Sequence, residues 1–366
     1  MNNLKSDKKA RVIAFYLPQF HPIPENNKWW GAGFTEWNSV NRAKPLFFGH
    51  KQPKEPADLG YYDLRVSETR EQQAKLAIKA GVEGFCYWHY WFGGEKRLLE
   101  RPFNEVLNSG QPNFPFCLGW ANHDWYQKLW DPKGYGDKLL IQQQYLGIDD
   151  YKKHFVEVLL PAFTDPRYIK VDNKPLFVIY SLANKNAIAE IINCWKSLAL
   201  ENGLEGIYFV AVRRNESIDE IKSLGFDAMY RLQDYLKSYV NQPYLKKLFL
   251  FLRLKLFKIP RLIPYSSLFK DLYTTDDYRE DSIPIIIPNY DHTPRSGSRG
   301  FVLTGSTPKK FGIQVKKAIS FLTSKRDDKK IIFLVSWNEW GEGNYMEPDS
   351  IYGMEYINTL SEILKN

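Results

Sequence analysis

Eight short apolar segments recur along the 366-residue chain, and each is followed by a polar, glycine-rich or proline-rich loop. Most are apolar throughout instead of alternating between apolar and polar residues. This pattern is typical of parallel strands that are buried on both faces of a sheet. The predicted strands are Val12–Leu17, Val82–Tyr87, Phe116–Ala121, Leu176–Ser181, Ile207–Val212, Ala228–Leu232, Ile283–Ile287 and Ile331–Ser336.

Helical patterns lie between several of these strands. Ser67–Ala80 begins with a serine that predicts an N-cap, has acidic residues in its first turn and ends before Gly81. Ala187–Ala199 and Pro308–Ser324 are also helix-like. Eight strands with helical crossovers predict an α/β fold, a (β/α)8 TIM barrel. A doubly wound dinucleotide-binding sheet is disfavoured because no G-x-G-x-x-G follows a strand, and there is no P-loop.

We expect one catalytic barrel domain over residues 1–366, with a flexible N-terminus at residues 1–10 and an insert at residues 236–275. The insert lies between the sixth and seventh strands and is both basic and apolar. Two interpretations stay open: an element packed over the barrel, and an element that docks on a membrane surface or a partner. The cations of its central stretch are Lys246, Lys247, Arg253, Lys255 and Lys258.

Composition indicates a reduced, cytoplasmic protein. Residues 1–11 are polar and basic, and the apolar run after them is too short for a signal peptide. No run of about 18 apolar residues predicts a membrane span. The three cysteines, Cys86, Cys117 and Cys194, form no metal-type pair. The net charge of +8 is partly local to the insert, and we expect no nucleic-acid partner.

Polar and aromatic residues gather where the predicted strands end, which is where TIM barrels place their active sites. Aromatic rings stack on sugar faces, while amides, imidazoles and carboxylates bond hydroxyl groups, so this set predicts a carbohydrate pocket. The predicted substrate-binding residues are Tyr16, His21, Glu36, Trp88, His89, Tyr90, Trp120, Asn122, Asp124, Tyr290, Asp291, Arg295, Trp337 and Asn338.

Some of these residues allow two interpretations. The histidines lack the spacing of metal ligands, so we expect them to bind hydroxyl groups, with no metal and no cofactor. Glu36 and Asp124 are either substrate-binding or structural carboxylates. Asp291 and Arg295 either form a pair that fixes a loop or contact an anionic group of the substrate.

Glu339 and Glu342 are the predicted catalytic residues. Glycosidic chemistry needs an acid at the leaving oxygen and a second carboxylate near the anomeric carbon. In a helical turn, side chains three residues apart share one face at about 5–6 Å. Two carboxylates held together separate their pKa values, so that one stays protonated near neutrality. The alternative is a pair of capping or ion-paired glutamates at the rim of the barrel.

Five segments of the chain are distinctive: FYLPQFHP at 15–22, WGAGFTEW at 30–37, WAN at 120–122, DHTPR at 291–295 and WNEWGEG at 337–343. Together they resemble the WbsX-like proteins of bacterial surface-polysaccharide (O-antigen and capsule) biosynthesis, which are often called glycosyltransferases. The resemblance spans about Arg11 to Pro348. These proteins are similar in turn to glycoside hydrolase family 99, the endo-α-mannosidases and endo-α-mannanases, which are TIM barrels.

Family 99 is a retaining family whose mechanism passes through a 1,2-anhydro sugar. The resemblance implies that Glu339 withdraws the proton of the sugar 2-hydroxyl and that Glu342 is the acid and then the base at the leaving oxygen. It implies neither metal nor nucleotide. Gly341 stands where the hydrolases usually carry histidine, and the 236–275 insert has no counterpart there.

The sequence therefore leaves three alternative functions open. The first is a retaining glycoside hydrolase or transglycosylase acting on a bacterial surface polysaccharide. The second is a glycosyltransferase of O-antigen or capsule biosynthesis, and the third is a non-catalytic glycan-binding barrel. The expected partner is an oligosaccharide or lipid-linked glycan. Peripheral contact through 236–275 would place the protein at the inner face of the cytoplasmic membrane.

Overall fold

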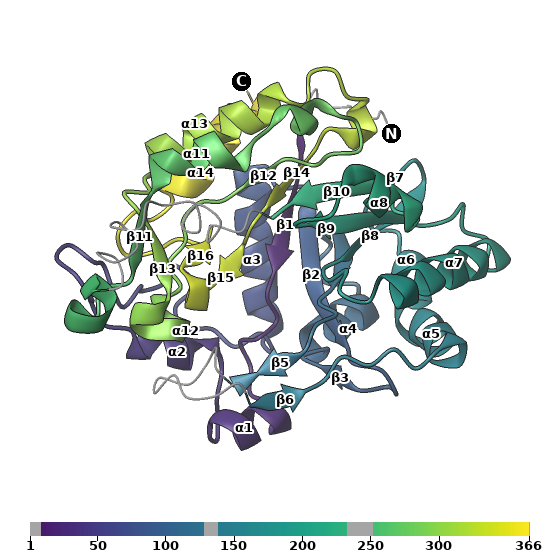
Figure 1. The fold of residues 1–366 in the computed structure, drawn as a ribbon, viewed down its shortest axis with the longest axis horizontal. Helices are drawn as coiled ribbons and strands as arrows, with labels where there is room; N and C mark the ends of the chain where they lie inside the picture. The colour runs from purple at the N-terminus through teal and green to yellow at the C-terminus, as the bar shows by residue number, and fades with distance from the viewer. Residues whose placement is uncertain (1–8, 128–137, 233–251, 366) are drawn as a thin grey trace.

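The computed structural model describes residues 9–127, 138–232 and 252–365, and its centre is a ring of eight parallel strands (Figure 1). The order β10-β9-β8-β4-β2-β1-β14-β12 follows the chain around the ring. All eight predicted strands are present: β1 (Arg11–Tyr16), β2 (Gly84–Trp91), β4 (Phe116–Trp120), β8 (Lys174–Ile179), β9 (Tyr208–Arg213), β10 (Ala228–Arg231), β12 (Ile285–Ile286) and β14 (Ile331–Leu334).

The ring closes between β10 and β12, the two ends of this strand order, through Met229 of β10. Its N–H donates to the Asp281 carbonyl at 2.8 Å, and its own carbonyl accepts from the Ile283 N–H at 2.8 Å. Strands paired on both sides leave no edge, and β4 and β14 are buried at every position. The predicted (β/α)8 barrel is therefore confirmed.

Helices surround the barrel (Figure 1). They are α1 (Pro24–Trp30), α2 (Glu36–Arg42), α3 (Ser67–Ala80), α4 (Arg101–Ser109), α5 (Ile148–His154), α6 (Leu160–Phe163), α7 (Lys185–Glu201), α8 (Ile218–Ser223), α11 (Tyr265–Leu272), α12 (Thr293–Ser296), α13 (Pro308–Ser320) and α14 (Glu355–Lys365). Shorter helical turns are η2 (Phe155–Leu159), η3 (Thr275–Tyr278), η4 (Gly297–Arg299), η5 (Asp327–Lys329) and η6 (Trp340–Glu342).

The predicted helix at 67–80 has the predicted bounds but not the predicted cap. Ser67 is already helical in α3, and the N-cap is Val66, which has no side-chain cap hydrogen bond. The Ser67 hydroxyl donates instead to the Glu68 carboxylate at 3.0 Å. Gly81 ends the helix at φ 85°, a left-handed conformation that glycine adopts without strain.

Several two-stranded ribbons extend the loops of the barrel. They pair β5 (Trp125–Tyr126) with β6 (Leu139–Ile141), β11 (Arg261–Pro264) with β13 (Phe301–Thr304), and β15 (Asn338–Glu339) with β16 (Asn344–Tyr345). Two further short strands, β3 (Arg97–Leu98) and β7 (Lys170–Val171), pair with β2 and β8. In Figure 1, α1, α2, α12, β5 and β6 lie at the end toward which β1 points, so they surround the site end of the barrel.

The predicted insert is only partly described, because its residues 236–251 lie outside the described residues, as do residues 1–8 of the predicted flexible N-terminus. Its described part forms a short helix at 252–257, then β11 and α11. In the described ranges, no helix is long and apolar enough to cross a membrane.

Candidate active site

A cavity of about 430 Å³ opens at the carboxyl ends of the barrel strands. Aromatic side chains from several strands and loops form its walls, and this surface suits the faces of sugar rings. Trp88 is stacked against Phe15 at 4.7 Å between ring centroids, and Tyr290 against Phe301 at 4.5 Å, so both are held in place. The main wall residues are Trp88, Tyr90, Trp125, Tyr180, Tyr230 and Tyr290.

Glu339 and Glu342 both line this cavity because the chain turns back on itself after β14. Glu339 ends β15, η6 forms the turn and β16 returns antiparallel to β15. Gly343 closes the turn at φ 53°, and a Cβ there would lie 2.7 Å from the Asp291 Cβ, so the close approach requires glycine. The helical turn expected between the two glutamates is this single 3-10 turn.

Arg295, in α12, joins three carboxylates at the wall of the cavity. Its Nε and Nη2 atoms each lie 2.9 Å from Glu36 Oε1. Its Nη1 atom is bonded to Glu342 Oε1 and lies 3.4 Å from Glu339 Oε1. We call these four residues the arginine cluster. One guanidinium cannot balance three ionised carboxylates. The remaining negative charges repel one another, and this repulsion favours protonation of the carboxyl groups.

The two predicted catalytic glutamates differ in their electrostatics. Burial and the neighbouring charge of Glu342 raise the pKa of Glu339 to about 8. Burial would also raise the pKa of Glu342, but Arg295 and then His292 outweigh it and hold this pKa at about 2. Near neutrality the pair therefore carries one proton, on Glu339, and one negative charge, on Glu342.

Glu36 does not line the cavity. It is fully buried at the start of α2 and contacts Arg295 from behind. Burial raises its pKa to about 7, against the opposing charge of Arg295. The structure thus places Glu36 as a structural carboxylate of the arginine cluster and not as a substrate contact.

Five of the predicted substrate-binding residues line the cavity, and nine do not. Those that line it are Trp88, Tyr90, Asp124, Tyr290 and Arg295. For these five, substrate contact stays a prediction. The other nine are buried behind the cavity wall, where most of them join elements of the barrel: Tyr16, His21, Glu36, His89, Trp120, Asn122, Asp291, Trp337 and Asn338.

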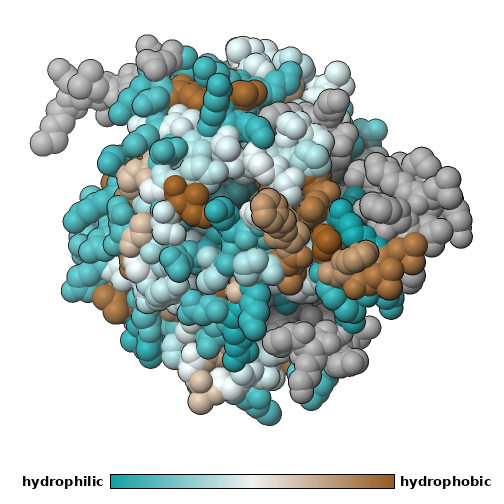
Figure 2. Space-filling model, turned by 90° about the vertical axis from the view of Figure 1, so that its left-hand side faces the viewer, coloured by the Kyte–Doolittle hydropathy of each residue, from teal (hydrophilic) through white to brown (hydrophobic). Residues whose placement is uncertain are grey.

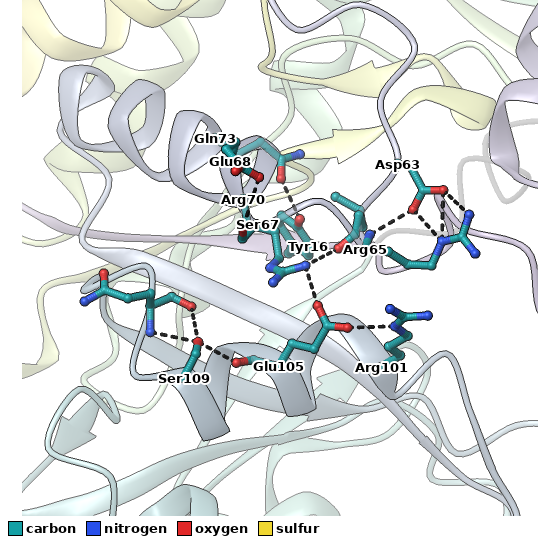
Figure 3. A network of polar contacts seen from close by, with 12 residues as sticks. Tyr16, Asp63, Arg65, Ser67, Glu68, Arg70, Gln73, Arg101, Glu105 and Ser109 are labelled. Atoms are coloured by element: carbon teal, nitrogen blue, oxygen red, sulfur yellow. Dashed lines mark hydrogen bonds and ion pairs between the residues drawn. The ribbon is translucent and has the colours of Figure 1, made fainter.

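Tyr16 illustrates the second group, because its side chain leaves the barrel toward α3. Its hydroxyl donates to Gln73 Oε1 at 2.6 Å, as Figure 3 shows beside the ion pair of Arg70 with Glu105 that joins α3 to α4. His89 bonds His154 at 2.7 Å between their Nε2 atoms, and burial holds the pKa of both histidines well below the usual value.

Two asparagines tie strand ends together instead of facing the cavity. Asn122 exchanges two hydrogen bonds with the Ser181 backbone, at 2.7 and 2.8 Å. Asn338 does the same with the Leu17 backbone, at 2.7 and 3.0 Å. These bonds fix the ends of the strands from which the cavity residues project.

The remaining members of this group are held by backbone bonds and packing. The Trp120 indole donates to the Trp91 carbonyl at 2.9 Å, and Trp337 packs against Phe85. His21 is buried, and burial lowers its pKa.

Asp291 does not pair with Arg295. Its Oδ2 accepts from His50 at 2.7 Å and from Gln52 at 2.6 Å, and its Oδ1 accepts from the Thr293 hydroxyl at 2.6 Å. Asp291 therefore fixes the loop that leads into α12, with partners different from the expected one.

The cavity is also lined by residues that were not among the predicted site residues, and these include Tyr180, Arg214 and Tyr230. Tyr180 and Tyr230 lie at the carboxyl ends of the fourth and sixth predicted strands, and Arg214 follows the fifth. Applying the strand-end argument evenly to all eight strands would have included them. In the described parts of the chain, no three His, Cys, Asp or Glu side chains are grouped to hold a metal ion.

Comparison with solved structures agrees with the barrel. A glycoside hydrolase-like protein matches with a TM-score of 0.56 and 15% identity, over 100% of this chain and 97% of that one. A glycoside hydrolase family 99 endo-α-mannosidase from Bacteroides thetaiotaomicron matches with a TM-score of 0.59 and 15% identity, over 97% and 96% of the two chains. At this identity, the likeness shows the fold alone.

Comparison of sequences shows the family. Two curated relatives are both "Uncharacterized protein WxcX" of Xanthomonas campestris pv. campestris, from strains B100 and ATCC 33913. Each is 32% identical over 97% of this chain and 50% of its own length. The chain thus spans about half the length of these relatives. The family model described as "Glycosyltransferase WbsX" matches residues 12–360, nearly the whole chain, and the protein therefore belongs to the WbsX family.

Proposed function

We propose that this protein is a retaining glycoside hydrolase or transglycosylase that acts on the glycosidic bonds of a bacterial surface polysaccharide, without a nucleotide. The observation that carries the proposal is the arginine cluster. It holds two carboxyl groups in one aromatic-walled cavity, one protonated and one ionised near neutrality. Cleavage of a glycosidic bond needs these two states together.

The closeness of the two carboxyl groups supports retention of configuration. Both contact the same Arg295 nitrogen, one at 3.4 Å and the other directly. Their oxygens are therefore at most about 6 Å apart, close to the shorter carboxyl separation of retaining glycosidases and below the range of inverting ones.

A transferase function is the second candidate, and one observation favours it: the description of the matching family is a glycosyltransferase. A transferase would use a nucleotide sugar or a lipid-linked donor. The curated relatives are about twice as long as this chain, so a partner domain could supply donor chemistry in those proteins. The same cavity and the same two glutamates would then bind the acceptor.

We further propose that the substrate is lipid-linked and reached at the inner face of the cytoplasmic membrane. The described helix at 252–257 exposes Leu252, Leu256 and Phe257 at 43%, 70% and 69% beside Lys255 and Lys258. Figure 2 shows this face of the molecule, where hydrophobic and hydrophilic side chains adjoin. Exposed apolar residues interspersed with cations suit an anionic lipid surface.

This helix leads directly toward the cavity. The next element is β11, which pairs along its length with β13, and Arg261 lies opposite Phe301. Phe301 lines the cavity. A lipid surface under the helix would therefore lie close to the mouth of the site.

The membrane proposal is tested by sedimentation with phosphatidylserine-containing vesicles. The double variant Leu256→Glu, Phe257→Glu should lose most of the binding, whereas Leu200→Glu, at an exposed leucine of α7, should not. Equal binding by the two variants would contradict it.

The catalytic proposal is tested by a product assay with α-mannan fragments and with the surface polysaccharide of the source organism, with and without nucleotide sugars. We expect cleavage or transfer without nucleotide, reduced by about 10²–10⁴ in Glu342→Gln and in Glu339→Gln. The control is Glu157→Gln, which changes an exposed glutamate outside the cavity. Extension that requires a nucleotide sugar would favour the transferase. No product from the wild type under any condition, together with unchanged binding of the polysaccharide by both site variants, would favour a glycan-binding barrel.

A further inference from the structure

A second cavity, of about 310 Å³, adjoins the first. Tyr290 lines both cavities, so they meet at this ring. Residues of β13, β16 and α14 form part of its walls, and these elements lie together on the left of the barrel in Figure 1. The loop at 47–54 lines another side. The proposed reaction gives this second cavity no role, although it lies beside the catalytic one.

The walls of the second cavity combine aromatic rings with hydroxyl groups. Phe47 is stacked on His50 at 4.2 Å between ring centroids, and Tyr352 packs edge-on against Tyr356 at 5.5 Å. The Ser306 and Tyr356 hydroxyl groups are hydrogen-bonded at 2.7 Å. Small-molecule sites measure about 300–1,000 Å³ and pair apolar rings with a few polar groups, so this cavity has the size and surface to hold one sugar residue.

Two lysines of the 47–54 loop bring positive charge to the second cavity. Lys51 is exposed and Lys54 is half-buried, and both line the cavity. Burial lowers the pKa of Lys54. Asp291 and Asp349 oppose this shift, whereas the nearby charge of Lys51 adds to it. Within residues 9–127, 138–232 and 252–365, no carboxylate lies within ion-pair distance of either ammonium group, so the repulsion between the two lysines is not relieved by a direct partner.

The two carboxylates that line this cavity are already used by other groups. Asp291 accepts the bonds that fix the loop into α12. Asp349 accepts from the Tyr345 hydroxyl at 2.7 Å and from the backbone N–H groups of Ile351 and Tyr352 at 3.0 and 2.7 Å. Both carboxylates therefore hold the cavity walls, and the lysine ammonium groups are left to bind a ligand.

We propose that the second cavity binds a sugar residue that carries a carboxylate, further along the same glycan whose bond is placed in the first cavity. Lys51 and Lys54 bind the carboxylate, and the sugar ring packs on the aromatic wall. A phosphate group, with a charge of about −1.5 to −2, is disfavoured because Asp291 and Asp349 line the same cavity. The inference rests on the proposed function, since it names an acidic polysaccharide as the substrate class of that reaction.

An NMR titration of the whole protein tests this site without any catalysis. The probes are the methyl glycosides of glucuronic, galacturonic and mannuronic acid, each compared with its neutral counterpart and with inorganic phosphate. Ile351 lines the cavity and is 43% exposed, so its methyl signal in isotope-labelled protein reports binding there. At least one uronide should shift this signal. Hydrogen bonds to charged groups contribute about 1.5–3 kcal/mol, so Lys54→Met and Lys51→Met should each weaken binding about tenfold or more.

The matched control is Lys316→Met, at an exposed lysine of α13 outside both cavities, and it should bind the uronide as the wild type does. The proposal is overturned if no uronide shifts the Ile351 signal, or if both cavity variants bind it unchanged. It is also overturned if a neutral glycoside or phosphate binds as tightly, because the first has no carboxylate and the second no sugar. If Lys54→Met does not fold, the exposed Lys51 decides alone.

The link between the two cavities is tested by kinetics on an acidic polysaccharide that the wild type cleaves. Neither lysine lines the first cavity, so the Lys51→Met, Lys54→Met double variant should raise KM by about tenfold or more and change kcat much less. An unchanged KM in a variant that has lost uronide binding would overturn the inference, because the bound sugar would not belong to the same glycan. A wild type that binds the uronide but cleaves no glycan would count against the proposed function and not against the uronide site.

Discussion

Two buried glutamates, Glu36 and Glu347, lie in clusters that differ in one respect. Both carboxyl groups have a pKa raised to about 7 by burial. Glu36 faces the charged Arg295, whereas Glu347 accepts only neutral bonds. These come from Tyr62 at 2.8 Å, Gln73 at 2.6 Å and Trp340 at 2.7 Å. We call this second group the Glu347 cluster.

The two clusters also differ in charge balance and in access to the cavity. The arginine cluster has one cation for three carboxylates, and three of its residues line the cavity, as the proposed proton exchange with a substrate requires. The Glu347 cluster is closed and neutral when protonated, and it joins α3 to η6 through Gln73 and Trp340. Its satisfied hydrogen bonds hold the turn that carries Glu339 and Glu342, the proposed catalytic pair.

The largest expected effect comes from removing the cation. Arg295→Met would remove the cation that three buried carboxyl groups share, and loss of one member of a buried ion pair costs about 3–5 kcal/mol. We expect this loss of unfolding free energy in urea unfolding at pH 8, and a smaller loss at pH 5, where Glu36 and Glu339 are protonated. A variant as stable as the wild type at both pH values would contradict the charge balance of the arginine cluster.

The Glu347 cluster should show its effect as a pH dependence of stability. The folded pKa of about 7 exceeds the unfolded value, so this group stabilises the fold below about pH 4.5 and loses its contribution as pH rises through 7. The full change is about 3 kcal/mol. Glu347→Gln does not titrate, so the difference in unfolding free energy from wild type should change across this window. If the difference in unfolding free energy between wild type and Glu347→Gln is the same at pH 4 and pH 8, the raised pKa of Glu347 is refuted.

Gly341 should be coupled to Glu36 and not to Glu347. Gly341→Ala forces a methyl group into the Glu36 carboxylate, and overpacking of this kind costs about 1–3 kcal/mol. In a Glu36→Ala background, most of that cost should disappear. A double-mutant cycle by thermal unfolding measures the coupling, with Glu347→Gln as the background in which the cost should persist.

The smallest effect is expected at the aromatic wall. Trp88→Ala removes a ring that lines the cavity, and one aromatic stacking contact contributes about 0.5–1.5 kcal/mol. We expect KM for the polysaccharide to rise by up to about tenfold while kcat changes little. Trp120→Phe, behind the wall, should affect stability and leave KM in place.

The sequence predicted the strands well because buried parallel strands are apolar throughout. All eight predicted segments overlap barrel strands, and α3 has its predicted ends. The prediction that Ser67 is the N-cap of α3 was wrong. The helix starts after Val66 without a side-chain cap, and the Ser67 hydroxyl donates to Glu68 instead. Hydrophobic pattern determines which segments are buried, while cap geometry depends on local competition between hydrogen bonds.

The site was predicted at the level of strand ends but not of side-chain direction. Successive strand residues point to opposite faces. Phe15 and Trp88 line the cavity, while Tyr16 and His89, one residue later, point away from it to Gln73 and His154. Alternation alone could have divided the predicted residues into two sets. Which set faces inward depends on how the barrel closes, and this is a tertiary property.

The direction of the Glu339 and Glu342 side chains was easier to predict, because these two residues lie in a turn and not along a barrel strand. The distance between Glu339 and Glu342 follows from one turn of chain, so local geometry sufficed. Their unequal pKa values did not follow from that segment, since the cation comes from Arg295 and its orientation from Glu36, both distant in sequence.

The most direct test of the account is to follow the anomeric configuration of the first product by NMR. Wild-type protein would be incubated with the polysaccharide substrate and without any nucleotide sugar, and the anomeric proton of the released end would be recorded before mutarotation. We expect release of the same anomer that was present in the substrate, as two close carboxyl groups on one arginine require. An inverted anomer, or no release until a nucleotide sugar is added, would contradict the account.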